Sequence, residues 1–82
     1  MDFKVKLGNS NNAALFVSVC SSFEPYIDYK IGRYTVDAKS IMGVLSTSLD
    51  KVATVIINTD DEHIIKSFKK NINLWIVEVQ YY

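Results

Sequence analysis

The sequence predicts a two-layer α+β domain, with four strands and three helices in the order strand, helix, strand, strand, helix, strand, helix. Three observations carry this prediction. Residues 2–7 alternate between apolar and charged, which is typical of a strand with one face in water. The pair Gly32-Arg33 separates two β-rich segments and predicts a hairpin. Residues 62–76 carry apolar side chains at helical spacing. Since the chain has 82 residues, we expect one domain over residues 1–82.

The first strand is followed by a predicted helix. Residues 8–12, Gly-Asn-Ser-Asn-Asn, all favour turns or helix N-caps. They predict a helix from about residue 11 to residue 22, and Pro25 ends it. The residues of this helix that repeat at core-facing positions are Ala13, Phe16, Cys20 and Phe23.

The middle of the chain predicts a hairpin, a short helix and a fourth strand. The hairpin strands are expected at residues 26–31 and 34–37, on either side of Gly32-Arg33. A short helix should begin at Ser40 and end at Ser46, and residues 51–58 read as the fourth strand. The strand residues expected to face the core are Ile27, Tyr29, Ile31, Val55 and Ile57.

The clearest helix start lies in the last third of the chain. Thr59-Asp60-Asp61-Glu62 matches a capping box, with Thr59 as the N-cap and Glu62 reaching back to it. The apolar stripe of this helix consists of Ile64, Ile65, Phe68, Ile72, Trp75 and Ile76. Where the helix ends stays open, because Val77, Val79 and Tyr81 alternate as in a strand.

Composition excludes several classes of function. Nine Lys and Arg residues balance nine Asp and Glu residues, so no basic surface for nucleic acid is indicated. No apolar run reaches the roughly 18 residues of a membrane span, and no signal peptide is indicated. The single cysteine, Cys20, excludes an internal disulfide, and we expect it to be buried in a cytoplasmic protein. Without a metal-ligand cluster, a nucleophile paired with a base or a phosphate loop, no cofactor and no enzymatic activity are expected.

The stretch Lys39-Ser40-Ile41-Met42-Gly43-Val44-Leu45-Ser46 resembles the regulatory-serine motif of HPr, the small phosphocarrier of the bacterial sugar phosphotransferase system. The predicted order of elements is similar to that family across almost the whole chain. The resemblance implies an open-faced β-sandwich, a four-stranded antiparallel sheet of order 1-4-2-3 with three helices on one face.

The acceptor histidine of the HPr family is missing from its expected position. In that family, a histidine at the N-terminus of the first helix accepts phosphate from enzyme I, assisted by helix amides and an arginine. Asn9 stands at the histidine position and Asn11 at the arginine position. An asparagine amide has neither a nucleophilic ring nitrogen nor the guanidinium fork that would hold a phosphoryl group. We therefore do not expect phosphotransfer through a histidine at this place.

Ser40 is the position at which the resemblance implies regulation. In many Gram-positive bacteria a dedicated kinase phosphorylates this serine of HPr, and the product regulates carbon use. A phosphate at a helix N-terminus would meet unpaired N–H groups and the positive end of the helix dipole. The same hydroxyl also suits a simple N-cap, so both roles stay open.

Apolar side chains next to Ser40 are candidates for a docking surface. Ile41, Met42 and Leu45 fall on one side of the short helix. With Ala14 and Val17 of the first helix, they match the docking positions of HPr proteins. The resemblance implies protein partners here: enzymes of the phosphotransferase system, the serine kinase or a carbon-control regulator. The alternative is that these side chains pack into the core.

Three functional hypotheses follow. The leading one is a regulatory or binding module that is not phosphorylated on histidine and uses Ser40 and the docking residues. The second is an active phosphocarrier with another acceptor, for which only Ser10 and His63 are candidates. The third is an interaction protein that reuses the fold, with Ser40 merely a cap. In the segment Trp75–Tyr82, Tyr81 and Tyr82 could contribute a dimer contact, so a monomer and a weak dimer both stay open.

Overall fold

A computed structural model of the chain describes residues 1–77 and has the predicted order of elements, followed by a short 3-10 helix. The predicted alternation at Val79 and Tyr81 and the contact assigned to Tyr82 lie outside the described residues. The elements are β1 (Asp2–Val5), α1 (Ser10–Ser21), β2 (Ile27–Ile31), β3 (Tyr34–Asp37), α2 (Ile41–Leu45), β4 (Ala53–Ile57), α3 (Glu62–Ile72) and η1 (Asn73–Trp75).

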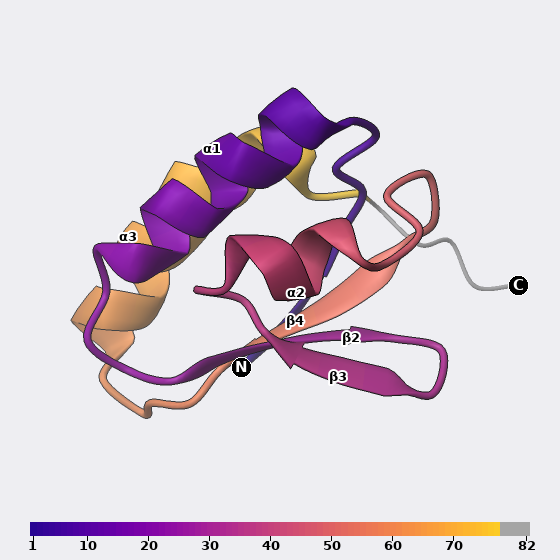
Figure 1. Cartoon of the computed structure of the whole chain (residues 1–82). Helices are drawn as coiled ribbons and strands as arrows, with labels where there is room; N and C mark the ends of the chain where they lie inside the picture. Colours follow the sequence, from indigo (N-terminus) through magenta and orange to yellow (C-terminus); the bar gives the residue numbers. More distant parts are fainter. Residues whose placement is uncertain (78–82) are drawn as a thin grey trace, which may run out of the picture.

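The four strands form one antiparallel sheet in the order β1-β4-β2-β3, and the three helices cover one of its faces (Figure 1). This confirms the architecture that the resemblance implies. The two central strands pair through Tyr29 and Val55, and Val55 also pairs with Phe3 of β1. These three residues are buried, so the helix-facing side of the sheet forms the floor of the core.

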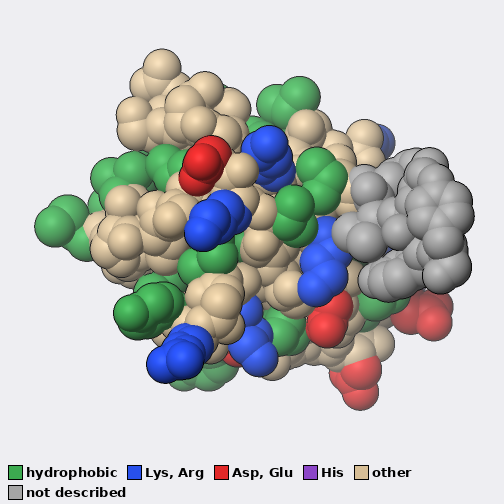
Figure 2. Space-filling view, turned by 90° about the vertical axis from the view of Figure 1, so that its right-hand side faces the viewer, with side chains coloured by type: hydrophobic (Ala, Val, Ile, Leu, Met, Phe, Trp, Pro, Cys, Tyr) green, Lys and Arg blue, Asp and Glu red, His purple; other side chains and the backbone are tan. Residues whose placement is uncertain are grey.

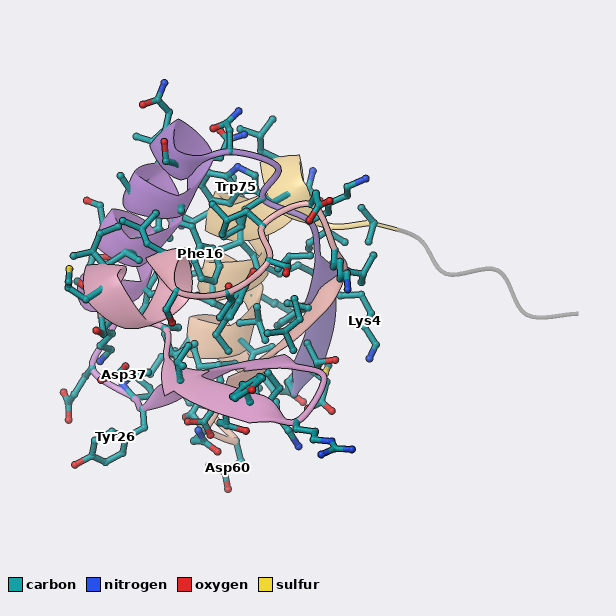
Figure 3. The ribbon with its side chains drawn as sticks, turned by 45° about the vertical axis from the view of Figure 1, so that its right-hand side comes forward. Lys4, Phe16, Tyr26, Asp37, Asp60 and Trp75 are labelled. Carbon is teal, nitrogen blue, oxygen red and sulfur yellow. The ribbon has the colours of Figure 1, made fainter. Side chains whose placement is uncertain are left out.

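Aromatic rings fill much of the space between helices and sheet. The ring centroid of Phe16 in α1 lies 5.7 Å from that of Tyr29 and 5.8 Å from that of Trp75. The planes of the Phe16 and Trp75 rings meet at 85°, an edge-to-face arrangement. A second cluster places Phe68 of α3 against Phe3 and Phe23. Figure 3 shows Phe16 and Trp75 inside this layer and Lys4 pointing away from it. Offset and edge-to-face pairs of this kind contribute about 0.5–1.5 kcal/mol beyond the apolar area they bury.

The opposite face of the sheet is polar, as the alternation predicts. The strand register places Asp2, Ile56, Asp28 and Asp37 in one row across the sheet. The next row contains Lys4, Thr54, Lys30 and Thr35. These side chains are exposed or half-buried. One face of each strand is therefore solvated while the other carries the core.

The predicted capping box at Thr59 is wrong in its assignment of the cap. The N-cap of α3 is Asp61, whose Oδ1 accepts hydrogen bonds from the backbone N–H groups of His63 (2.9 Å) and Ile64 (3.3 Å). The Thr59 hydroxyl instead accepts from the N–H of Asp61. A carboxylate is the stronger acceptor at a helix N-terminus, so α3 begins two residues later than a cap at Thr59 would place it.

Other element boundaries differ by small amounts. The strand predicted over residues 51–58 is shorter, since β4 covers Ala53–Ile57. The helical stripe continues to Trp75 because η1 follows α3 directly. After η1 the chain pairs with β1: Ile76 forms a bridge with Val5, and the Val77 N–H donates to the Lys4 carbonyl (2.9 Å). Within residues 1–77, no helix has the length and apolar character needed to cross a membrane.

Two buried polar atoms, the Tyr29 hydroxyl and the Trp75 Nε1, have no hydrogen-bond partner among the described residues. Burial raises the pKa of Tyr29. The Thr47 hydroxyl donates its hydrogen bond to the Val44 carbonyl, at 2.7 Å. Burial also raises the pKa of the Cys20 thiol to about 12, so this thiol is protonated at neutral pH.

Candidate functional site

Side chains at the start of α1 form hydrogen bonds with the backbone there. Asn9 is the N-cap, and its Oδ1 accepts a hydrogen bond from the Asn12 N–H at 2.8 Å. The Asn12 side chain in turn donates to the Leu7 carbonyl at 2.8 Å. Gly8 precedes the cap with a φ of +86°, a left-handed conformation that favours glycine. The Asn9 amide therefore acts here as a helix cap, and it has no ring nitrogen to act as a nucleophile.

The other candidate acceptors lie apart. Ser10 and Asn11 are exposed in the first turn of α1. His63 is exposed in the first turn of α3. Figure 1 shows α1 and α3 side by side with opposite directions, so His63 lies at the far end of the helical layer from Asn9. The fold does not bring this histidine to the start of α1.

The start of α2 uses the same type of cap with a different group. Ser40 is the N-cap, and its Oγ accepts a hydrogen bond from the Gly43 N–H at 3.1 Å. The Ser40 backbone N–H donates to the Asp37 carbonyl at 2.9 Å. The Ser40 side chain is half-buried. Its hydroxyl is therefore held in place by the backbone of the helix that follows it.

Two residues close to Ser40, Gly43 and Lys39, determine how the start of α2 packs against the rest of the molecule. A Cβ added at Gly43 would lie 3.3 Å from both the Ser40 Oγ and the Val36 Cβ, so glycine lets α2 approach β3 closely. The Lys39 ammonium donates to the carbonyls of Phe23 (2.6 Å) and Glu24 (3.2 Å). These two residues follow α1, so Lys39 ties the start of α2 to the end of α1. Ser40 and Asn9 consequently lie at opposite ends of the paired helices α1 and α2.

An exposed apolar surface lies beside Ser40. Ile41, Met42 and Leu45 are 37%, 78% and 41% exposed, whereas Val44 alone from α2 is buried in the core. We call Ile41, Met42, Leu45 and the exposed Ala14 of α1 the apolar patch. Methionine at its most exposed position suits a surface that has to fit more than one shape. The alternative that the α2 members pack into the core is thereby wrong.

Val17 does not belong to this surface. It is only 8% exposed and packs within the core cluster, so its assignment as a docking residue is corrected. Because the core stripe of α1 is wide, it includes Val17 together with Ala13, Phe16 and Cys20. Sequence reasoning also missed Leu15, which is 57% exposed on α1 next to Ala14. No local signal separates Leu15 from Val17, because both flank the Ala13/Phe16/Cys20 stripe and only packing decides which of them is covered.

The sequence and the structure of the chain are both similar to those of known proteins. A family model described as PTS HPr component phosphorylation site matches residues 9–73. The match begins at Asn9 and includes Ser40 and the whole apolar patch. No curated protein matches the chain by sequence.

Solved structures agree with this match. HPr-C-His from Thermoanaerobacter tengcongensis is similar with a TM-score of 0.69 and 31% sequence identity, covering 89% of this chain and 91% of that one. The phosphocarrier protein HPr from Bacillus anthracis str. Ames has the same fold with a TM-score of 0.60 and 24% identity, covering 88% and 95% of the two chains.

Proposed function

Because this chain belongs to the HPr family of the bacterial sugar phosphotransferase system, we propose that it is a regulatory and binding module that carries no phosphate on histidine. Its switch is the hydroxyl of Ser40, and its docking surface is the apolar patch. HPr proteins are cytoplasmic phosphocarriers rather than enzymes, and we expect this chain to act in the same compartment.

The observation that carries the proposal is the contrast between two helix starts. Asn9, where the family resemblance places the acceptor histidine, holds a cap with no nucleophilic nitrogen. Ser40 holds a cap whose oxygen is a nucleophile that a kinase can activate. A serine kinase would transfer the γ-phosphoryl group of ATP to Ser40 Oγ, releasing ADP and the hydroxyl proton.

Phosphorylation of Ser40 would change the charge next to the apolar patch. A phosphoserine adds about −1.5 to −2 charges at pH 7 and three acceptor oxygens. The first N–H groups of α2 have no partner within the helix, so they favour an anion at this place. Met42 and Ile41 immediately follow Ser40, and the added charge would therefore alter which partners the patch accepts.

Two parallel incubations test the proposal. In one, the chain is incubated with phosphoenolpyruvate and enzyme I of a bacterial phosphotransferase system. In the other, it is incubated with ATP and an HPr serine kinase. Intact-protein mass spectrometry should show one added phosphate only with ATP and the kinase, and Ser40→Ala should lose it. Ser46→Ala is the matched control, because Ser46 lies at the other end of the same helix and should leave the labelling unchanged.

Each alternative has its own outcome. Phosphate acquired from phosphoenolpyruvate would contradict the proposal and favour an active phosphocarrier, with acid-labile phosphate indicating His63 and acid-stable phosphate indicating Ser10. The absence of label in both incubations, together with a stable dimer in solution, would favour an interaction protein in which Ser40 is only a cap.

A further inference from the structure

A cavity of about 470 Å³ lies between the turn that joins β2 to β3 and the loop that follows α2, and Ser40 is not among its lining residues. The hairpin contributes Arg33 and Tyr34, and the loop contributes Thr47 and Lys51. The complete lining is Ile31, Gly32, Arg33, Tyr34, Val36, Ser46, Thr47, Ser48 and Lys51. Its volume falls within the range of about 300–1,000 Å³ that is typical of small-molecule sites.

The charges around this cavity favour an anion. Arg33 and Lys51 line it from two different segments, and among the described residues no carboxylate lines it. A guanidinium fork and an ammonium that approach from two sides are the usual protein groups for a phosphate. Figure 2 looks onto this end of the molecule and shows both blue Lys and Arg and red Asp and Glu side chains on it, so the absence of a carboxylate applies to the cavity lining and not to the whole face.

Two of the three serine and threonine hydroxyls that line the cavity, those of Ser46 and Thr47, can only accept hydrogen bonds from a ligand, whereas Ser48 can also donate one. Ser46 Oγ donates to the Gly43 carbonyl at 2.6 Å, and Thr47 Oγ1 donates to the Val44 carbonyl at 2.7 Å. Each hydroxyl has one proton, and both protons are used to cap the C-terminus of α2. Ser46 and Thr47 therefore have only lone pairs left to offer. A matching ligand carries hydroxyl or amine donors close to its negative charge.

Apolar side chains form most of the remaining wall, together with Gly32 and Ser48. Ile31 and Val36 are half-buried, and the Tyr34 ring is 72% exposed. An exposed aromatic ring at the rim is a platform on which a flat ring can stack. The lining thus combines two cations, three serine and threonine hydroxyls, of which Ser46 and Thr47 can only accept, and one aromatic side chain within a single cavity.

We propose that this cavity binds a phosphorylated ribose, either free or as part of a nucleotide. The phosphate lies between Arg33 and Lys51, and the sugar hydroxyls donate to Ser46 and Thr47. In a nucleotide the base lies on Tyr34. Ser40 is not part of this lining, and the proposed site does not depend on the function proposed above.

Titration of the full chain, followed by the backbone amide NMR spectrum at low salt, tests this site. The probes are ribose 5-phosphate, AMP, inorganic phosphate and unphosphorylated ribose. We expect saturable shifts confined to residues 31–36 and 46–51 with the first two probes, and weaker binding of the other two. Arg33→Gln and Lys51→Gln should each weaken ribose 5-phosphate binding about tenfold, because each removes a charge-assisted contact.

The control variant is Lys66→Gln, which removes a cation from α3, outside the cavity, and should change the affinity less than twofold. Tighter binding of AMP than of ribose 5-phosphate, with the gain lost in Tyr34→Ala, identifies the nucleotide. Equal binding of the two identifies the free sugar phosphate. The proposal is overturned by an absence of saturable shifts, by inorganic phosphate binding as tightly as ribose 5-phosphate, or by Lys66→Gln weakening binding as much as Arg33→Gln.

Discussion

The starts of α1 and α2 use one structural device with two different chemical groups. In each, the N-cap side chain accepts a hydrogen bond from the N–H three residues later, at 2.8 Å for Asn9 and 3.1 Å for Ser40. The backbone requirement is the same, because both helices begin with unpaired N–H groups. An asparagine meets this requirement without offering a nucleophile, whereas a serine meets it and keeps one. A helix start can therefore lose its chemistry without losing its structure.

The surfaces around these two caps also differ. The first turn of α1 presents the exposed polar residues Ser10 and Asn11. The first turn of α2 presents Ile41 and Met42, and Met42 is the more exposed of the two. Exposed apolar groups that cluster in this way are typical of interaction sites. The proposed phosphorylation site and most of the proposed docking surface therefore both lie on α2 and its N-cap.

The largest effect should come from placing an imidazole and a guanidinium where the family resemblance puts the phosphate acceptor and its arginine. The double variant Asn9→His/Asn11→Arg places an imidazole and a guanidinium at the start of α1, where helix amides favour a phosphoryl group. We expect acid-labile phosphate from phosphoenolpyruvate and enzyme I, compared with none in the parent chain. Phosphate analysis at acid and alkaline pH measures it. Asn9→Ala/Asn11→Arg is the control, and label on this control would show that another residue is the acceptor.

The second effect concerns the apolar patch. Met42→Ser should weaken binding of the serine kinase about tenfold, because a central exposed apolar anchor of an interface typically contributes more than 1 kcal/mol. Titration calorimetry measures the dissociation constant. Leu74→Ser is the matched control, since Leu74 has the same exposure of 78% but lies in η1. Equal losses in both variants would contradict a specific patch.

The third effect tests the shared capping role. Asn9→Ala and Ser40→Ala should each lower the free energy of unfolding by about 1 kcal/mol, because each leaves a helix N–H without its partner. Asn9→Ser and Ser40→Asn should retain most of the stability, since these residues also cap helices. Urea denaturation measures all four. If Asn9→Ser destabilised the fold as much as Asn9→Ala, the cap would not be the reason for the loss.

The smallest effect concerns Cys20 on α1. The pKa of its thiol depends on its burial and on the charges of Asp37 and Lys39, which precede α2. Burial raises the pKa of its thiol from 9.0 to about 12, Lys39 opposes this rise and Asp37 adds to it. Above pH 9 the unfolded chain releases a proton that the folded chain retains, so stability falls as pH rises through this range. At pH 9.5 the loss from this one group is about 0.8 kcal/mol.

Urea denaturation between pH 7 and pH 9.5 checks this expectation. Cys20→Ala should have lower stability at neutral pH, because it removes buried volume, but a flatter dependence on pH. An unchanged slope in this variant would assign the alkaline loss to other groups. Tyr29 is one such group, because burial also raises its pKa from 10.0.

Local patterns predicted the elements well where a single strong rule applied. The third strand was placed at Tyr34–Asp37, as the structure has it, because Gly32 supplies the left-handed turn residue between two alternating segments. The short helix was bounded by Ser40 and Ser46, which are its two caps. The cap of α3 was misplaced because Thr59, Asp60 and Asp61 all satisfy the same sequence rule, and only the backbone path selects Asp61.

The candidate site was predicted in part. Asn9, Ser40, Ile41, Met42 and Leu45 lie where the sequence placed them, at helix starts and on an exposed side. Burial of Val17 and exposure of Leu15 were not predicted, because the width of a buried stripe depends on what packs against it. The cavity between Arg33 and Lys51 was not predicted at all, since its walls come from segments that only the fold brings together.

By itself, the sequence determined the order of elements, the alternation of the strands and the residue that caps α2, while it placed the start of α1 about one residue too late. These features depend on neighbours within about four positions, so local chemistry is sufficient. The tertiary structure decided which apolar side chains are covered and which stand free beside Ser40. It also decided that Lys39 joins two helices. Burial and long-range contacts depend on how separate elements pack, and packing is a property of the whole chain.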